Sequence, residues 1–288
     1  MLIKQKDKLL IVIGMGRAGS NFIFYQLQNH PQITVPALTE ISYFTKFYDK
    51  GDNWYNKQYD ISGESTALDV SANYFLSEDA IKRIKKFNPD AKLVLGVRLP
   101  SDWALSYYQQ MNTYNYDINS FSNFIKEFKW NSDKGEEKID LTNGFVSEQI
   151  KLFMREFGGN LLIYDYKFLK NNPLQLLNQI ENFIGIKQHF NSKTFDNKIV
   201  NAGNRKNLKW LMKIISHDKF RIFINDTFPK KTVNGLRKLF VKFNSPSKNS
   251  SKESLFSESD IKHSQLIFKN DDKFVEDMFL KNKSFICK

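Results

Sequence analysis

Three glycines, an arginine and a serine follow the first apolar run of the sequence, and residues of these types can bind an anion. The run LLIVI leads into GMGRAGS, residues 14–20. Glycines let the backbone turn tightly, and the start of a helix offers unpaired N–H groups and the positive end of the helix dipole. We expect a helix that begins near Ser20, whose hydroxyl can cap those N–H groups. With the fixed charge of Arg17, the turn predicts a phosphate site.

The spacing of the glycines distinguishes between nucleotide-binding loops. Gly14 and Gly19 have the interval of a P-loop ATPase, but Ser20 stands where that loop needs lysine, which argues against an ATPase or kinase. Gly14, Gly16 and Gly19 do satisfy G-x-G-x-x-G, and Glu40 lies about where a ribose-binding acid is expected. A Rossmann-type dinucleotide-dependent oxidoreductase therefore stays open as an alternative.

A second candidate anion site follows the apolar run 92–97. Arg98 stands at the end of this predicted strand, and Ser106 comes eight residues later on a predicted helix. The forked donors of an arginine and the short donor of a serine can bind one phosphate together. The alternative is a surface salt bridge for Arg98 and a packing role for Ser106.

Strand-length apolar runs alternate with stretches of helical spacing along the chain. The predicted strands are Leu9–Ile13, Lys92–Val97 and Leu161–Tyr164. The predicted helices are Ser20–Gln28, Ser77–Phe87, Ser101–Met111, Ser147–Phe157 and Pro173–Ile184. This alternation predicts an α/β fold, a central parallel sheet flanked by helices, with a helical C-terminal part from Lys206 onward. We expect a single domain, 1–288, with a flexible loop at 244–254.

The composition limits the partners and the compartment. A net charge of +12 indicates an anionic partner or a basic solvated surface. The chain lacks a recognisable module for reading nucleic acid, so no specific nucleic acid is expected, although a non-enzymatic basic nucleic-acid-binding protein stays a second alternative. Cys287 is the single cysteine, which excludes an intramolecular disulfide and favours a reducing compartment. The first apolar run is too short for a signal peptide, so we expect a cytoplasmic protein.

Several segments together resemble one enzyme family. Residues 17–20 (RAGS) resemble the 5'-phosphosulfate loop of sulfotransferases that use 3'-phosphoadenosine 5'-phosphosulfate (PAPS), and Arg98 with Ser106 resembles their 3'-phosphate motif. Residues 39–44 (TEISYF) look like the stretch that carries the catalytic glutamate in heparan-type sulfotransferases. The motifs are most similar to those of heparan-type (carbohydrate) and bacterial sulfotransferases, and the resemblance covers most of the chain.

The resemblance implies a P-loop-like sulfotransferase fold and a role for each matching residue. PAPS is then the sulfuryl donor, adenosine 3',5'-bisphosphate is the product and no metal is required. Glu40 is the expected general base, and Arg17 is expected to hold the 5'-phosphosulfate and stabilise the leaving group. The remaining cofactor-binding residues implied are Ala18, Gly19, Ser20, Asn21, Arg98, Ser106, Arg205 and Lys206. The last two resemble a basic loop that closes over the cofactor, and a solvated basic turn explains them equally well.

The acceptor is less well defined than the donor. Asn21, Asp69 and Val70 depart from the heparan-type pattern, so the sequence leaves carbohydrate, lipid-linked and small-molecule acceptors open, through a hydroxyl or an amine. The basic, apolar-rich segment 206–243 predicts either an ordinary core face or peripheral membrane contact. His30 is interpreted as a structural residue, and Asp69 as a hydrogen-bonding residue rather than a catalytic one. Oligomeric state is not predicted.

Overall fold

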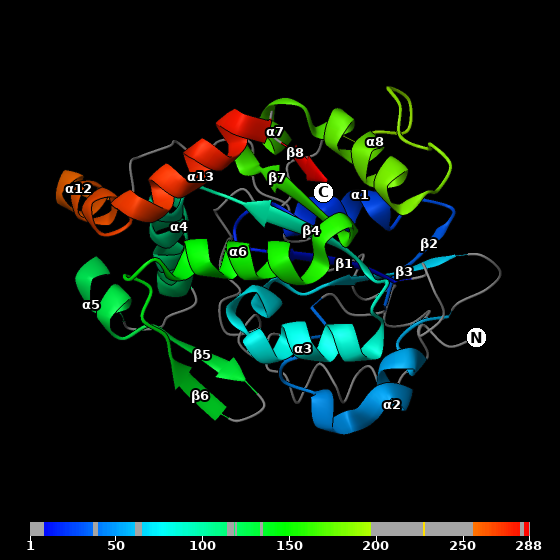
Figure 1. Ribbon diagram of the computed structural model, residues 1–288, viewed down its shortest axis with the longest axis horizontal. Coiled ribbons are helices and arrows are strands. Elements are labelled where there is room, and N and C mark those ends of the chain that lie inside the picture. Colours follow the sequence, from blue (N-terminus) through cyan, green and yellow to red (C-terminus); the bar gives the residue numbers. More distant parts are fainter. Residues whose placement is uncertain are drawn as a thin grey trace.

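The computed structural model contains a six-stranded sheet with the order β2-β3-β1-β4-β7-β8 (Figure 1). The structure describes residues 9–36, 40–60, 65–113, 118, 120–132, 135–196, 227, 256–282 and 285–287. The strands are β1 (Leu9–Gly14), β2 (Ile33–Thr34), β3 (Thr66–Val70), β4 (Lys92–Val97), β7 (Leu161–Asp165) and β8 (Phe285–Cys287). The first five are parallel, and β8 runs antiparallel to β7.

The central strand β1 is buried on both faces, as its continuous apolar sequence predicts. Successive side chains of a strand point to opposite faces. Ile11 and Ile13 therefore join one hydrophobic cluster, whereas Leu10 and Val12 join another. The sheet needs a layer of helices on each side.

Two layers of helices cover the sheet. The larger cluster includes side chains from α2 (Gly51–Lys57), α3 (Glu78–Phe87), α4 (Pro100–Thr113), α5 (Phe121–Lys126), α6 (Phe145–Phe157), α12 (Glu258–Ile267) and α13 (Lys269–Asn282). The opposite face packs against α1 (Ser20–Leu27), α7 (Tyr166–Asn171) and α8 (Pro173–Ile184). Short 3-10 helices at Tyr48–Lys50, Ala72–Leu76 and Gly158–Asn160 and a hairpin of β5 (Lys129–Ser132) and β6 (Gly135–Lys138) complete the described elements.

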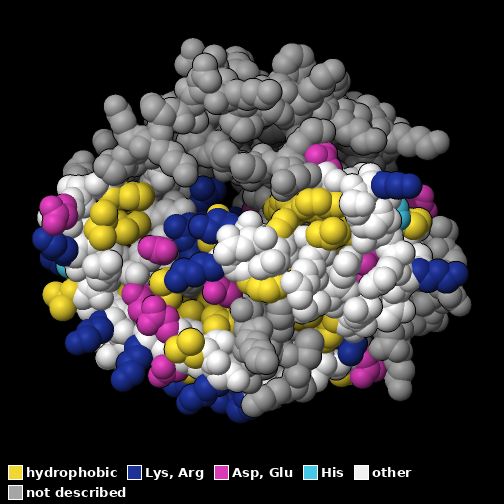
Figure 2. Space-filling model, turned by 90° about the horizontal axis from the view of Figure 1, so that it is seen from above, with side chains coloured by type: hydrophobic (Ala, Val, Ile, Leu, Met, Phe, Trp, Pro, Cys, Tyr) yellow, Lys and Arg dark blue, Asp and Glu magenta, His cyan; other side chains and the backbone are white. Residues whose placement is uncertain are grey.

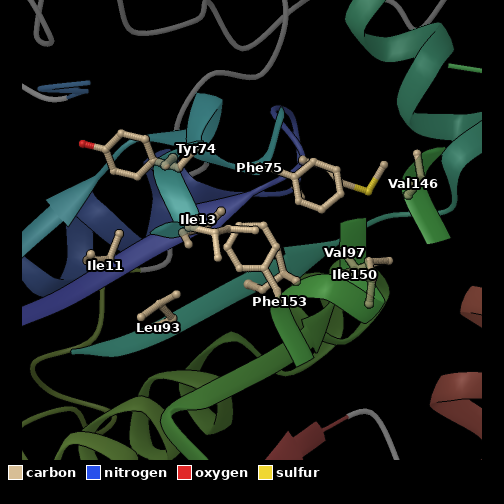
Figure 3. Packing of buried hydrophobic residues seen from close by; sticks show 14 of the residues in the cluster. Ile11, Ile13, Tyr74, Phe75, Leu93, Val97, Val146, Ile150 and Phe153 are labelled. Atoms are coloured by element: carbon tan, nitrogen blue, oxygen red, sulfur yellow. The ribbon is translucent and has the colours of Figure 1, made fainter. Parts of the chain in front are cut away.

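Helix α6 holds the centre of the larger layer. Figure 3 shows Phe153 of α6 beside Ile13 of β1 and near Phe75. The rings of Phe75 and Phe153 stack with centroids 6.1 Å apart. Side chains of both central strands are fully buried here, so this packing holds α6 against β1 and β4, which are paired with each other in parallel.

The C-terminal helices are attached to the helices that cover the sheet. Asp271 accepts a hydrogen bond of 2.8 Å from the N–H of Ser147 in the first turn of α6. Asp272 accepts one of 3.0 Å from the N–H of Ser101 in the first turn of α4, and Ser264 donates to the Ser101 carbonyl. Carboxylates satisfy the unpaired N–H groups and the dipole at helix starts. α13 thus positions α4 and α6.

The fold class predicted from the sequence is confirmed, and its elements lie within three residues of the predicted ranges. One detail is wrong: Gly19, with φ 96°, is the N-cap of α1 without a side-chain capping bond, and Ser20 is the first helical residue. The sequence does not predict the strands β2, β3 and β8, the helices α2, α5 and α7 or the β5–β6 hairpin. The expected loop 244–254 lies outside the described residues, and the single-domain assignment stays a prediction. Among described helices, none is long and apolar enough to cross a membrane.

Candidate active site

Three predicted segments meet at the carboxyl edge of the parallel sheet. β1 and β4 are paired in register up to Gly14 and Gly96, so the glycine loop and Arg98 leave the sheet at the same edge. β3 ends there too, because Val70 pairs with Val12. The N–H of Glu40 donates to the Val70 carbonyl at 3.0 Å, which places Glu40 at this edge as well.

The loop between β1 and α1 is held tightly by its neighbours. The N–H of Met15 donates to the Gly96 carbonyl at 3.2 Å, and the N–H of Ala18 donates to the Met15 carbonyl at 2.9 Å. Gly19 has a left-handed backbone, and a Cβ atom there would lie 2.1 Å from Leu169 Cδ2. Only glycine satisfies both constraints without displacing the Leu169 side chain of α7.

The start of α1 leaves a set of amide donors at the loop. The N–H groups of Phe22 and Ile23 both donate to the Gly19 carbonyl. In the described part of the chain, no backbone carbonyl accepts from the N–H groups of residues 19–21. The sequence implies that residues 18–21 all bind the anion. The Ala18 N–H is used within the turn, so three of these four amides are left for an anion. The remaining three suit an oxyanion.

Arg17 connects the two predicted anion motifs. Its Nε donates to Ser106 Oγ at 3.2 Å, across 89 residues of sequence. The spacing argument pairs Ser106 with Arg98, whereas the hydrogen bond that the structure gives Ser106 is to Arg17. The hydroxyl of α4 thus lies directly beside the glycine loop, and one ligand can contact both.

Arg98 contributes a second cation at the same edge. Its guanidinium carbon lies 5.2 Å from the ring centroid of Tyr166, which also has Lys170 Nζ at 5.4 Å. The Nε of Arg98 is buried and has no hydrogen-bond partner among the described residues. A buried donor without an acceptor is costly, so this atom favours an anionic ligand.

A pocket of about 400 Å³ opens beside Arg98. It is lined by Leu99, Asp165, Lys167, Val275, Glu276, Phe279 and Leu280, and so lies between α13 and the ends of β4 and β7. Figure 2 shows Lys and Arg side chains gathered near the middle of the face that carries α13. The lining of the pocket itself combines one lysine and two carboxylates with an apolar wall, and the cationic Arg98 and Lys170 lie nearby.

Glu40 is exposed and lies on a strained loop. Glu40 and Ser42 both have φ 55°, a left-handed conformation that is uncommon for residues other than glycine. Asp69 lies at the end of β3, fully buried, and burial raises the pKa of its carboxyl, with a smaller contribution from the negative charge of Glu40. The end of β3 and the loop beside it thus bring an exposed carboxylate, Glu40, near a buried carboxyl group, Asp69.

His30 lies at the opposite end of the sheet. It precedes β2, whose Ile33 pairs with Thr66 at the start of β3, and Glu40 lies at that strand's other end. The Nδ1 of His30 accepts a hydrogen bond from the Gln32 N–H at 3.0 Å, and burial lowers the pKa of the His30 imidazole. These contacts agree with a structural role.

Arg205 and Lys206 lie outside the described residues. Within the described part of the chain, no three His, Cys, Asp or Glu side chains are grouped in a way that could hold a metal ion.

Sequence reasoning missed Tyr164, a residue of β7 that supports the loop. Its hydroxyl donates to the Ala18 carbonyl at 2.9 Å. The ring passes over Gly96, where a Cβ atom would lie 2.3 Å from the tyrosine oxygen. The glycine within the apolar strand β4 was the available signal, because glycine in a strand often marks a close approach.

The chain matches a family model that is described as a sulfotransferase domain, over residues 7–235. Since this range covers most of the sequence, the chain belongs to the sulfotransferase domain family, a family of transferases. Its fold agrees with that of a sulfotransferase from Alicyclobacillus acidocaldarius, with a TM-score of 0.51 and 18% identity over 66% of this chain and 88% of the other.

Sequence relatives include proteins named for heparan sulfate. The mouse bifunctional heparan sulfate N-deacetylase/N-sulfotransferase 4 is 29% identical over 204 residues, which are 65% of this chain and 23% of the mouse protein. The mouse heparan sulfate glucosamine 3-O-sulfotransferase 3A1 is 27% identical over 203 residues, 68% of this chain and 51% of that protein. This chain therefore spans about a quarter of the first relative and half of the second.

Proposed function

We propose that the protein transfers a sulfuryl group from PAPS to a hydroxyl or amine of a carbohydrate or glycoconjugate, and releases adenosine 3',5'-bisphosphate. The observation that carries the proposal is the hydrogen bond of 3.2 Å from Arg17 to Ser106, which joins two anion-binding motifs at one sheet edge. A ligand with phosphate groups at two positions suits two such motifs. The donor PAPS and its product both have that property.

The 5'-phosphosulfate is held by the glycine loop. The N–H groups of Gly19, Ser20 and Asn21 and the guanidinium of Arg17 donate to it, while Ala18 shapes the turn. Negative charge grows on the bridging oxygen as the bond from sulfur to the phosphate oxygen breaks. Donors already oriented toward that oxygen stabilise the transition state without reorganisation.

The 3'-phosphate is held by Arg98, whose buried Nε needs an acceptor, together with Ser106. Arg205 and Lys206 are proposed to close over the bound nucleotide. These contacts orient the donor so that its sulfuryl group faces the acceptor. Fixing two ends of the donor removes most of its freedom to rotate before reaction.

Glu40 is the proposed general base. It takes the proton from the acceptor oxygen or nitrogen as the new bond to sulfur forms, in line with the bond that breaks. An exposed carboxylate at the same sheet edge as the loop is within reach of an acceptor that approaches from solvent.

A carbohydrate acceptor is supported by the relatives that are named for heparan sulfate. The test is a thermal-shift panel of adenosine 3',5'-bisphosphate, ATP and NAD, followed by transfer of labelled sulfate from PAPS to de-N-acetylated heparosan, a lipid-linked sugar and simple phenols. The proposal predicts stabilisation by the bisphosphate above the other two and label in the polysaccharide. Stabilisation by NAD alone contradicts the donor, and label only in the lipid or the phenols contradicts the acceptor.

A further inference from the structure

We propose that Asp69 is a positioning residue, which holds the backbone of the loop that carries Glu40 through the hydroxyl groups of Ser71 and Tyr74. The inference rests on the proposed role of Glu40 as the base, and it assigns to Asp69 a function in that reaction without contact with the substrate.

Asp69 is the centre of a fully buried hydrogen-bond network. Its Oδ1 accepts from Ser71 Oγ at 2.7 Å, and its Oδ2 accepts from the hydroxyls of Tyr74 at 2.8 Å and Tyr55 at 3.0 Å. The side chains of all four residues are inaccessible to solvent. A buried carboxyl costs free energy, and the chain offsets that cost by giving it three donors.

The hydroxyls of Ser71 and Tyr74 also hold the loop that carries Glu40. Ser71 Oγ accepts from the Ser42 N–H at 3.1 Å, and the Tyr74 hydroxyl accepts from the Phe44 N–H at 3.3 Å. A hydroxyl has one hydrogen and two lone pairs. Because each hydrogen points at Asp69, a lone pair of each oxygen is left to face the loop. Asp69 therefore sets the direction of both hydroxyls.

The loop needs this support because its backbone is strained. Glu40 and Ser42 are both left-handed, with φ 55°, and such conformations persist only where the surroundings enforce them. The Ser42 hydroxyl donates to the Glu40 carbonyl at 3.3 Å, so the position of Ser42 bears directly on Glu40. A loop released at Ser42 moves the carboxylate of Glu40 away from the acceptor.

The substitution Asp69→Asn tests the relay with little change of shape. An amide offers one acceptor oxygen and one donor nitrogen, so at least one hydroxyl must turn its hydrogen toward a loop N–H. Ser71→Ala removes the hydroxyl that joins Asp69 to the Ser42 N–H and leaves Asp69 itself unchanged. Tyr59→Phe is the matched control, because the Tyr59 hydroxyl donates only to Tyr55 at 3.4 Å, one step away from the loop.

The first measurement is amide hydrogen exchange, which needs no ligand. We expect exchange of Ser42, of Phe44 or of both in Asp69→Asn to be about tenfold faster, the equivalent of one lost hydrogen bond, with β1 unchanged. Ser71→Ala speeds Ser42 alone, and Tyr59→Phe speeds neither. Wild-type exchange at Ser42 in both variants overturns the inference, as does uniform acceleration through β1. Should Asp69→Asn fail to fold, Ser71→Ala decides alone.

The second measurement separates positioning from donor binding. In Asp69→Asn, turnover of PAPS falls about tenfold or more, because a misplaced base reacts poorly, while affinity for adenosine 3',5'-bisphosphate stays at the wild-type value. Full turnover in this variant contradicts the inference alone. A wild-type protein that does not bind the bisphosphate contradicts the proposed function instead, and the exchange result then still reports on the loop.

Discussion

At the scale of single residues, the site is marked by backbone strain. Arg17, Glu40 and Ser42 are left-handed, although none is glycine. Each such residue costs on the order of 1–2 kcal/mol. Two of the three were assigned to chemistry from the sequence. Strain of this kind is often stored at functional sites, and here Arg17 and Glu40 both lie at the carboxyl edge of the sheet.

Glu40→Gln tests the base. Glutamine keeps the shape of the side chain and removes its basicity, so we expect turnover of PAPS to fall by about 10²–10⁴-fold. Affinity for adenosine 3',5'-bisphosphate, measured by calorimetry, should not change. Asp49→Asn, on the short helix that follows the Glu40 loop, is the control and should keep wild-type turnover. Near-normal turnover in Glu40→Gln excludes it as the base.

Asp69 should leave a signature in the pH dependence of stability. Burial raises the pKa of its carboxyl above the ordinary value of 3.8, so in the window above that value the folded chain holds a proton that the unfolded chain releases. Stability from this group therefore falls as pH rises through the window. The asparagine side chain in the Asp69→Asn variant does not titrate, so this variant lacks that pH-dependent contribution.

The measurement is urea unfolding of both proteins from about pH 4 to about pH 7, the range above the ordinary carboxyl pKa. We expect the stability of Asp69→Asn relative to wild type to increase with pH, while all other groups cancel in the difference. If the stability difference between the two proteins does not change with pH, the pKa of Asp69 is the same in the folded and the unfolded chain, which contradicts the prediction.

At the scale of elements, the turn between β1 and α1 depends on a strand two places away. Tyr164 reaches the Ala18 carbonyl only because Gly96 has no side chain. A methyl at position 96 would displace the ring and with it the support of the loop. Loop geometry, and not only strand pairing, is thus encoded in β4 and β7.

Gly96→Ala is expected to destabilise the fold by about 1–3 kcal/mol, since extra volume in a packed core forces shifts. It should also weaken binding of adenosine 3',5'-bisphosphate, because the loop loses its tyrosine. Gly144→Ala is the control: its surroundings are open, so only its left-handed backbone, with φ +75°, opposes the change. Chemical denaturation checks the stability of both variants, and calorimetry decides: an equal loss of affinity for the bisphosphate at the two positions contradicts the account.

Elements with a continuous apolar pattern could be predicted from the sequence, and those defined by tertiary contact could not. β1 and β4 have runs of buried residues, and α8 starts at a proline, so their ranges are readable. β3 has Asp69 as its penultimate residue, which interrupts the apolar pattern although the carboxyl is satisfied by the hydroxyls of Tyr74 and Tyr55. β8 has only three residues and depends on β7 for pairing.

The sequence names the candidate residues of the site, and the structure adds a contact between two of them that the sequence does not show. The sequence interval between Arg98 and Ser106 predicts that the two bind one phosphate, and the rotation of α4 also brings Ser106 to Arg17. Such a rotation is set by packing of Trp103 and by the bonds of α13, neither of which appears in a local pattern. Residue types identify an anion site, whereas tertiary packing decides which donors share an anion.

At the scale of the whole molecule, the C-terminal helices support the site from the far end of the sequence. Asp271 is buried and accepts from the backbone N–H and the hydroxyl of Ser147 in α6. Asp272 accepts from the backbone N–H of Ser101 in α4, the helix that carries Ser106. The donor site therefore depends on residues about 170 positions beyond it, the separation of Ser101 and Asp272 being 171.

Asp271→Ala tests this attachment. It leaves buried donors of α6 without an acceptor, and we expect a loss of about 1–3 kcal/mol in the free energy of unfolding. Asp277→Ala, an exposed change on the same helix, should cost less than about 0.5 kcal/mol. Urea denaturation compares the two. Equal midpoints would mean that α13 contributes little to the fold.

The central claim is that two anion anchors at one sheet edge bind a single nucleotide with two separate phosphates. The most direct test is calorimetry of wild type and Arg98→Ala with adenosine 3',5'-bisphosphate and with AMP, which lacks the 3'-phosphate. The account predicts that Arg98→Ala loses about 1.5–3 kcal/mol of affinity for the bisphosphate, the contribution of a charged hydrogen bond, and almost none for AMP. Equal losses for both nucleotides, or no loss for either, would contradict it.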